Sequence, residues 1–508
     1  MLAKIWSAAL VGLDAVPVEV EVDIASQGLP SFTIVGLPDK AVEESRERVR
    51  AALKNSGSEF PAKRITVNLA PADLPKEGPS YDLPIAVGIL IASGQLKADT
   101  TSSLFMGELS LDGRLRNTNG ALPEALLARE KHIQNLYLPR PNASEASCIA
   151  GINVFPVDNL GILFYHLSGQ KLIEACPYNP IDTSVIQNNF DYDMKDIKGQ
   201  EKAKRALEIA AAGAHNILFK GPPGSGKTLL ARTVSSIMPI LTFSEVLEIT
   251  KIYSISGLNQ EGLITKRPFR SPHHTTSAVG VIGGGTYPKP GEISLSHRGV
   301  LFLDELPEFP RTVLESLRQP LEDGVVTIAR AQGRITFPAK SMLIAAQNPC
   351  PCGYLGDNSH NCTCSPSQII RYQKKISGPL LDRIDIHIEV PKVDTKKLTS
   401  KDIQNAESSK EIRERVQKAR DMQTKRFTGT KLSANSDMDS RDIKVFCTLN
   451  DECLNLLRNA VDKFQLSARS YYRIIKLSRT IADLEGTEEI AQNHIAEALQ
   501  YRPRQNTY

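Results

Sequence analysis

Apolar and polar residues alternate along the first part of the chain, and this pattern predicts an α+β unit. Residues 16–35 (VPVEVEVDIASQGLPSFTIV) repeat with a period of two, which indicates two strands joined by a turn at 27–30. In residues 39–55 the apolar positions fall on one face of a helix, with charged residues around the rest. Two further elements are predicted, a strand at 65–69 and a buried helix at 84–93. We expect this unit to end near Cys176.

A polar stretch rich in Asn, Asp and Pro at 177–194 predicts a linker, and strands and helices alternate after it. The predicted order is a helix at 200–213, a strand at 216–220, a glycine-rich loop, a helix at 227–236 and strands at 300–303 and 341–346. Such alternation is typical of a parallel sheet with helices on both faces. Beyond residue 390 the chain becomes helical and strongly charged. It predicts a solvated helix at 410–426 and a small helical bundle from residue 440.

Length and composition fit a globular protein of about three domains. The 508 residues carry a net charge of +4, so any contact with nucleic acid must come from local basic clusters. The longest apolar run, 83–92, is too short to span a bilayer, and Asp14 interrupts the signal-like amino terminus. We therefore expect a first strand there, and no membrane segment. Of eight cysteines, four lie between Cys350 and Cys364, which favours a metal site in a reducing compartment, the cytoplasm.

The predicted strand, loop and helix at 216–236 contain the complete phosphate-binding pattern of P-loop proteins. The pattern comprises Gly221, Pro222, Pro223, Gly224, Ser225, Gly226, Lys227 and Thr228. Glycines let several backbone N–H groups point at the phosphates, and the following helix presents its positive end to them. We expect Lys227 to reach the β and γ phosphates of ATP and Thr228 to bind Mg²⁺. A glycine-rich turn is the alternative, but the flanking strand and helix favour the nucleotide site.

Acidic and amide residues follow two later strands. Asp304 and Glu305 come directly after the apolar strand at 300–303, at the edge where α/β sheets bind ligands. We expect Asp304 to hold Mg²⁺ and Glu305 to polarise the attacking water, although an isolated acidic pair would more often cap a helix. Asn348, after the strand at 341–346, is placed to orient that water, or else forms a turn before proline.

The four clustered cysteines have the spacing C-x-C-x₉-C-x-C. Cys350, Cys352, Cys362 and Cys364 match the ligand number of a closed tetrahedral zinc site. We expect a structural Zn²⁺ that shapes the loop beside Asn348. Free thiols are the alternative, and His360 within the loop is a candidate to replace one cysteine.

The segments GPPGSGKT, GVLFLDEL, SLRQPLEDG, AAQNPCPCG, LLDRIDIHIEV and SARSYYRIIKLSRTIADL resemble the ComM/YifB family of magnesium-chelatase-like AAA+ ATPases. The resemblance covers essentially the whole chain. It implies a hexameric ring in which Arg383 matches the arginine finger that enters the neighbouring subunit's ATP site. Arg469 matches the sensor-2 arginine of the helical lid, with Arg473 and Arg479 nearby on the same helix; surface salt bridges are the alternative for these arginines.

The resemblance also implies single-stranded or branched DNA as the substrate of a ring helicase that drives branch migration during recombination and natural transformation. Residues 325–337 predict a β-hairpin with Arg330 and Arg334 beside its tip, suited to gripping a phosphate backbone. Residues 266–290 read as a long basic loop that contains Lys266, Arg267 and Arg270. Exposed basic loops without a specific partner are the alternative for both segments.

The amino-terminal part resembles the Lon protease fold around PKEGPSYDLPIAVG and MGELSLDGRLRNTNGALPEALLA. In that comparison Ser80 stands at the nucleophile, but the partner lysine falls on Pro123, which has no base to activate a hydroxyl. The domains expected are therefore a non-proteolytic Lon-like domain of ribosomal S5 fold (1–176), an AAA+ core (195–395) and a helical lid (396–508). A chelatase-type motor that remodels a partner protein for metal insertion into a tetrapyrrole is the alternative function, and a protease is disfavoured by Pro123.

Overall fold

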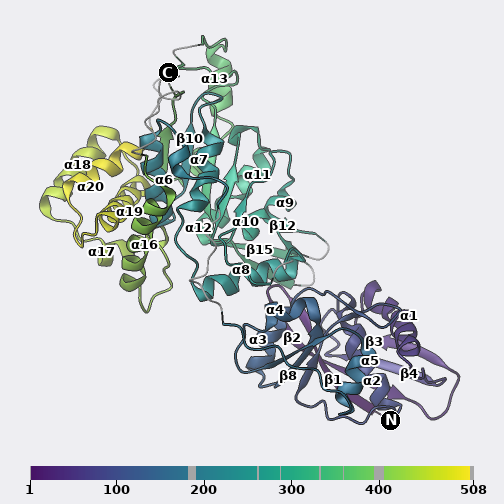
Figure 1. Cartoon of the computed structure of the whole chain (residues 1–508). Coiled ribbons are helices and arrows are strands. Elements are labelled where there is room, and N and C mark those ends of the chain that lie inside the picture. Colours follow the sequence, from purple (N-terminus) through teal and green to yellow (C-terminus); the bar gives the residue numbers. More distant parts are fainter. Residues whose placement is uncertain are drawn as a thin grey trace. The chain divides into compact units, whose positions relative to one another are not determined.

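A computed structural model describes most of the chain, and its elements are labelled in Figure 1. The described residues are 2–180, 190–259, 262–285, 288–330, 333–357, 360–393 and 406–503. The chain forms two compact units. Residues 1–184 together with 242–265 make the first unit, and residues 185–241 together with 266–508 make the second.

The first unit is built on a seven-stranded mixed sheet with the order β3-β4-β2-β1-β5-β8-β9. Its elements are β1 (Leu2–Val11), β2 (Asp14–Ile24), β3 (Ser31–Val35), α1 (Lys40–Asn55), β4 (Arg64–Ala70), α2 (Asp82–Ala92), β5 (Ser103–Phe105), β6 (Glu108–Leu109), β7 (Leu115–Arg116), α3 (Ala121–Glu130), β8 (Asn135–Pro139), α4 (Ala143–Ala146), β9 (Asn153–Val157), α5 (Leu160–Leu167) and α8 (Phe243–Ser256). The strand expected at the amino terminus is β1, which pairs antiparallel with β2. The two strands predicted at 16–35 are also present, but β4 lies between them and pairs with both.

Helix α1 has the amphipathic character that the sequence predicts. The carboxylate of Asp39 caps its amino terminus by accepting the backbone N–H of Val42 at 2.8 Å. The apolar positions that define its inner face are fully buried: Val42, Val49, Ala52 and Leu53. Each such side chain contributes about 1.5–3 kcal/mol when removed from water, alanine less, so this face anchors α1 in the core of the unit.

Ser80 and Pro123, which decide the prediction of a non-proteolytic domain, lie in separate turns of the first unit. Ser80 is the middle residue of a short 3₁₀ turn (Pro79–Tyr81), where its carbonyl accepts the N–H of Gly107 at 2.9 Å. Pro123 is buried in the first turn of α3. The non-proteolytic role stays a prediction.

Residues 242–265 join the first unit although they follow the phosphate-binding helix in sequence. The Oγ of Ser254, on α8, accepts the N–H of Gly120 at 3.1 Å, and Asn259 donates to the carboxylate of Glu145 at 2.9 Å. The apolar face of α8, including Val246 and Ile249, is buried. The sequence predicts this stretch inside the AAA+ core, whereas its contacts place it in the first unit; a helical pattern does not reveal which sheet a helix covers.

The second unit contains a five-stranded sheet with the order β11-β14-β17-β10-β18, in which all neighbouring strands are parallel. Its elements before the lid are α6 (Glu201–Gly213), β10 (Ile217–Lys220), α7 (Lys227–Thr233), β11 (Phe269–Arg270), α9 (Ala278–Ile282), β12 (Gly283–Gly284), β13 (Lys289–Pro290), α10 (Glu292–Leu295), β14 (Val300–Leu303), α11 (Arg311–Ser316), α12 (Arg318–Asp323), β15 (Val325–Arg330), β16 (Gly333–Pro338), β17 (Met342–Gln347), α13 (Pro366–Gln373), α14 (Gly378–Leu381) and β18 (Ile386–Glu389). This is the parallel α/β architecture predicted. The carboxyl ends of β10, β14 and β17 meet at one edge, which is where ligands bind in such sheets.

The carboxyl-terminal part is helical and packs on the sheet of the second unit (Figure 1). Its helices are α16 (Ser409–Arg426), α17 (Ser440–Phe446), α18 (Asp451–Phe464), α19 (Ala468–Glu485) and α20 (Gln492–Ala498). The prediction that 410–426 is a solvated helix is wrong for one face, on which Ile412, Val416 and Ala419 are buried. Charged residues of this helix find partners within the protein, which the local pattern does not predict: Arg415 pairs with Glu208 of α6 at 2.7 Å.

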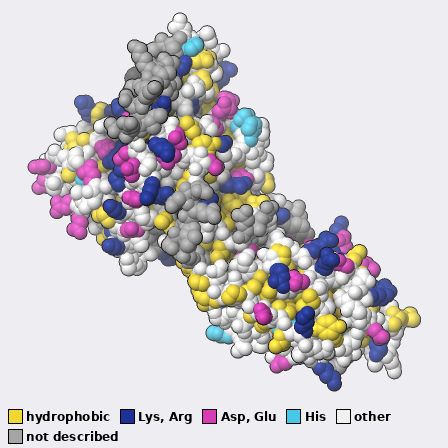
Figure 2. Space-filling model, viewed as in Figure 1, with side chains coloured by type: hydrophobic (Ala, Val, Ile, Leu, Met, Phe, Trp, Pro, Cys, Tyr) yellow, Lys and Arg dark blue, Asp and Glu magenta, His cyan; other side chains and the backbone are white. Residues whose placement is uncertain are grey.

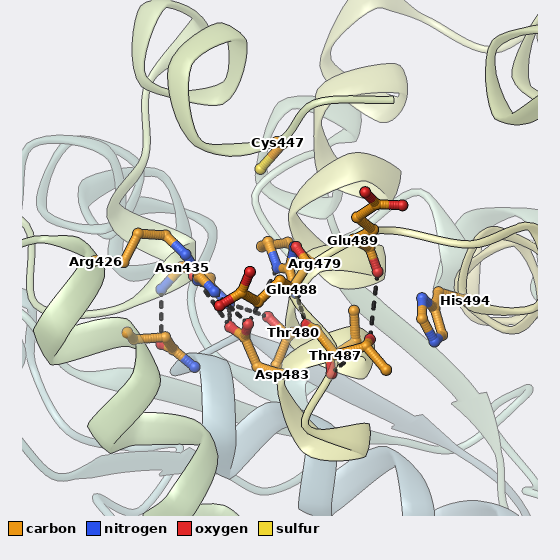
Figure 3. A network of polar contacts seen from close by, with 12 residues as sticks. Arg426, Asn435, Cys447, Arg479, Thr480, Asp483, Thr487, Glu488, Glu489 and His494 are labelled. Atoms are coloured by element: carbon orange, nitrogen blue, oxygen red, sulfur yellow. Dashed lines mark hydrogen bonds and ion pairs between the residues drawn. The ribbon is translucent and has the colours of Figure 1, made fainter. Parts of the chain in front are cut away.

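A buried polar network joins α19 to α16 and to the turn between α16 and α17 (Figure 3). The carboxylate of Asp483, which is fully buried, accepts hydrogen bonds from Arg426 at 2.9 Å, Arg479 at 3.1 Å and Asn435 at 2.8 Å. Arg479 also donates to the carbonyls of Thr487 and Glu488. Because every partner comes from a different turn of the lid, the network fixes how its helices pack.

We expect Asp483→Asn to destabilise the second unit by about 2 kcal/mol, because the buried guanidinium of Arg479 and the half-buried one of Arg426 lose their counter-charge while the shape is kept. Urea unfolding, followed by far-ultraviolet circular dichroism, measures the change in the free energy of unfolding. Asp462→Asn, on the exposed face of α18, is the matched control and should leave the unfolding midpoint unchanged. Equal midpoints for the two variants would contradict a stabilising role for the network.

Candidate ATP site and four-cysteine loop

The phosphate-binding loop connects β10 to α7, as the sequence predicts. Gly224 and Gly226 have φ angles of +74° and +87°, a left-handed conformation that favours glycine. A side chain on Gly221 would place its Cβ only 2.1 Å from the carbonyl oxygen of Val390. The three glycines of the motif therefore serve two purposes: two allow the turn of the loop, and one allows close packing against the chain after β18.

Lys227 is buried in the loop, with 8% of its surface exposed. Its Nζ donates to the carbonyls of Gly221 and Pro222, both at 2.8 Å, and to Oδ1 of Asn348 at 3.2 Å. Burial lowers the pKa of this lysine. The loop thus positions the ammonium group of Lys227 beside the amide of Asn348, which the sequence predicts at the same site.

Thr228 and Asp304 lie together, as a shared magnesium ion requires. The Oγ1 of Thr228 donates to Oδ2 of Asp304 at 2.7 Å, and Asp304 also accepts the N–H of Glu305 at 2.9 Å. A hydroxyl and a carboxylate are oxygen ligands of the kind that Mg²⁺ prefers. The donor set of Gly221 to Thr228, with Lys227 for the phosphates and Thr228 and Asp304 for the metal, fits ATP with Mg²⁺.

Glu305 adopts a left-handed backbone conformation with φ +51°, which is unusual for a residue other than glycine. Such backbone strain is often found at functional sites. Nδ1 of His274 lies 3.8 Å from the Glu305 carboxylate, and the His274 ring packs edge-on against Phe309. His274 is not among the residues predicted from the sequence; the signal for it is the polar segment SPHHT directly after β11, the strand beside β14.

The structure brings Arg383 and Arg469 to a common partner. Arg383, which follows α14, and Arg469, in the first turn of α19, both pair with the carboxylate of Glu322. Their neighbours Arg473 and Arg479 are buried and donate to carbonyl oxygens of their own chain. Of the three arginines on α19 considered from the sequence, Arg469 is the exposed one.

The candidate DNA-contacting residues fall into two groups. Arg334 is exposed on β16 of the predicted hairpin β15–β16, whereas the side chain of Arg330 and residues 331–332 lie outside the described residues. The expectation of one long loop at 266–290 is wrong, because β11, α9, β12 and β13 form within this stretch.

Two of the three basic residues assigned to DNA in that stretch have partners inside the protein. Arg267 donates to the carbonyls of Pro239 and Arg298, and Arg270 forms a two-pronged ion pair with Glu292 at 2.6 and 2.7 Å. Lys266 is exposed. Arg267 and Arg270 therefore hold the chain around β11 in place, which leaves Lys266 and Arg334 as the exposed candidates for a DNA contact. Figure 2 shows basic and acidic side chains intermixed over the helices at the left of the view, consistent with the net charge of +4.

The four cysteines of the loop after β17 lie close together. Their ligand atoms are all within 4.8 Å of one another, and the Sγ atoms of Cys350, Cys352 and Cys362 are 3.4–3.7 Å apart. Four sulfurs at about 2.3 Å from a tetrahedral Zn²⁺ would be about 3.8 Å apart, so the cluster is compatible with zinc. A backbone N–H from Tyr354 lowers the pKa of Cys352 to about 6, which favours a thiolate. His360 stacks on Tyr354 with ring centroids 4.8 Å apart, and the cluster of four ligands does not include it.

Comparison with known proteins covers nearly the whole chain. Residues 193–398 match the family "Magnesium chelatase, subunit ChlI", residues 20–142 match "Subunit ChlI of Mg-chelatase", and residues 406–502 match "Magnesium chelatase, subunit ChlI C-terminal". The chain is 47% identical to "Competence protein ComM" of Haemophilus influenzae, covering 99% of this chain and 97% of that protein. It belongs to the ComM/YifB family of magnesium-chelatase-like proteins.

Two further relatives extend this assignment. The YifB protein of Escherichia coli is 43% identical over 99% of this chain and 97% of its own length. Lon protease 2 of Bacillus subtilis is 31% identical over 160 residues, 30% of this chain and 28% of that protein, in keeping with a Lon-like amino-terminal region. Membership of the ComM/YifB family, with its AAA+ core, indicates ATPase activity. In the part of the chain that the structure describes, none of the helices combines the length and apolar character needed to cross a membrane.

Proposed function

We propose that this ComM/YifB protein is an ATP-dependent DNA helicase that works as a homo-hexameric ring and promotes branch migration in homologous recombination and natural transformation. The name of its Haemophilus relative, a competence protein, supports a role with incoming DNA. The eight cysteines are free, which supports a reducing compartment, the cytoplasm. The Lon-like region serves in this proposal as a non-proteolytic scaffold.

The observation that carries the proposal is the position of the hairpin β15–β16. Helices α11 and α12 separate it from β14, which ends directly before Asp304, and residues 339–341 lead from it into β17, which ends beside Asn348. Val326, Ile328 and Phe337 bury its inner face, while Arg334 is exposed near the tip. A hairpin anchored in this way is suited to carry a cation along a phosphate backbone when ATP binding moves the strands.

We infer the ring from the family resemblance, and the chemistry of the ATP site supports it. Lys227, Thr228, Asp304 and Glu305 supply phosphate, metal and water contacts from one subunit, and they leave the transition-state charge to an arginine from elsewhere. We assign that arginine to Arg383 of the neighbouring subunit. Hydrolysis is therefore expected to require assembly.

Strand displacement on a forked DNA tests the proposal most directly. We expect purified protein to unwind the fork with ATP and to hydrolyse ATP faster when single-stranded or branched DNA is present, and Lys227→Ala to lose both.

Arg334→Ala should weaken DNA binding and make it less dependent on salt, because each lost phosphate contact lowers the slope of log affinity against log salt by about 1. Arg458→Ala, an exposed arginine on α18, is the matched control.

A chelatase-type motor that remodels a partner protein remains the second candidate, since the match to a magnesium chelatase subunit covers residues 193–398. DNA distinguishes the two candidates. An ATPase that DNA fails to stimulate at any salt concentration would reject the helicase and favour the chelatase-type motor.

We also propose that the four-cysteine cluster holds one structural zinc ion. Cys350 and Cys352 precede α13, and Cys362 and Cys364 lie directly before its cap at Ser365, so a bound ion would close the loop onto this helix. Four protein ligands leave no open position for water, which excludes a catalytic metal of the usual kind.

Metal analysis of the purified protein should find about one zinc per chain, in line with four ligands for one ion. Cys352→Ser should lower that content and make the loop easier to cleave by protease, while Cys148→Ser, a buried cysteine of the first unit, should keep the zinc. If a chelator removed the zinc and the loop kept its resistance to protease, a structural role for the ion would be contradicted.

A further inference from the structure

Glu322 connects two arginines that are distant in the sequence. It lies near the end of α12, and its two carboxylate oxygens face different partners. Oε1 accepts from Nη2 of Arg469 at 3.1 Å, and Oε2 accepts from Nη2 of Arg383. One carboxylate thus holds two guanidinium groups side by side.

Few other contacts determine where Arg383 lies. Its side chain is 12% exposed, and Nη1 donates to the carbonyl of Pro379 at 2.6 Å. Its Nε is buried without a hydrogen-bond partner in the described part of the chain. Glu322 is accordingly the anion that neutralises this guanidinium and fixes its plane.

Glu322 also reduces the repulsion between the two arginines. Without it, two positive charges would stand next to each other, and the half-exposed Arg469 would be free to turn into solvent. With it, the three groups carry a net charge of +1 and keep a single arrangement. In the described residues, no hydrogen bond or ion pair joins them to Lys227, Thr228 or Asp304 of the same chain.

We propose that Glu322 is a positioning residue, which holds Arg383 and Arg469 together so that both reach one ATP in the neighbouring subunit. This inference rests on the proposed ring. Glu322 itself touches neither phosphate nor metal, and it acts through the arginines. A misplacement of about 1 Å in such a group is enough to slow a reaction about 100-fold.

The kinetic test compares Glu322→Ala, Glu322→Gln and Glu322→Asp. We expect Glu322→Ala and Glu322→Gln to lower kcat for ATP hydrolysis about 10- to 100-fold with little change in KM, and Glu322→Asp to restore part of the loss. Asp323→Asn, the neighbouring exposed carboxylate on α12, is the matched control and should keep wild-type kcat. A higher kcat in Glu322→Gln would overturn the proposal, because Glu322 would then restrain the arginines.

Mixed rings show whether Glu322 acts across the interface. Subunits with Glu322→Gln keep the phosphate loop, and subunits with Lys227→Ala keep both arginines and Glu322. Mixing the two should raise ATPase activity above that of either alone, since intact loops then meet intact arginine pairs. Lack of recovery, with both variants folded by thermal unfolding and assembled by size, would overturn the proposal. Wild-type activity per subunit that is independent of protein concentration and of assembly would instead reject the proposed ring.

Discussion

Replacing Arg383 by alanine should lower kcat for ATP hydrolysis about 10³- to 10⁵-fold, while binding of ATP is retained. An arginine supplied by a neighbouring subunit stabilises charge that develops on the phosphoryl group in the transition state and contributes little to ground-state affinity. Steady-state kinetics and titration with a fluorescent ATP analogue measure the two quantities separately.

The matched control for this experiment is Arg441→Ala. Arg441 is an exposed arginine on α17 that pairs with Asp439 at 2.9 Å. The Arg441→Ala variant should hydrolyse ATP at the wild-type rate. A kcat for Arg383→Ala within tenfold of wild type, in assembled protein, would refute its role as the finger.

Replacing Lys227 by alanine should reduce kcat/KM by at least about 100- to 1,000-fold, through weaker ATP binding and slower hydrolysis together. Lys227 is buried beside Asn348 and the loop carbonyls, and its ammonium group would exchange the carbonyls of Gly221 and Pro222 for phosphate oxygens. Because those oxygens carry more negative charge than a carbonyl, the exchange favours bound ATP.

Lys202→Ala, an exposed lysine on α6, is the control for Lys227→Ala and should bind and hydrolyse ATP normally. The variants Lys227→Ala and Arg383→Ala should differ in one respect: the first loses ATP affinity and the second keeps it. If both kept full affinity, Lys227 would not hold the phosphates in the way the loop geometry indicates.

Local sequence signals are sufficient to predict most of the individual elements and the positions of the phosphate-binding loop and of Asp304. The phosphate loop lies between β10 and α7 as predicted, and Asp304 follows β14 to meet Thr228 at 2.7 Å. These predictions succeed because glycine spacing, an apolar strand and an acidic residue at its end depend on neighbours within a few residues. His274 was missed because nothing near it in the sequence indicates that β11 pairs with β14.

The sequence pattern does not predict contacts between distant segments. A helix pattern marks an apolar face without naming what covers it, so the pattern of α8 did not show that 242–265 joins the amino-terminal unit. The charges of α16 likewise concealed a buried face, because Arg415 finds Glu208 only after folding. In both cases the partner lies outside the window in which periodicity is read.

Features that depend on neighbouring residues can be predicted along the chain: the strands, most helices, the phosphate-binding loop, the Asp304–Glu305 pair and the cysteine cluster. Which distant side chains come into contact depends on how the elements pack. Folding brings Arg383, in the turn after α14, and Arg469, on α19, to the carboxylate of Glu322 on α12, although the three residues are distant in the sequence. The physical reason is that spacing along the chain specifies backbone conformation, whereas an ion pair between distant segments forms only where packing brings its charges together.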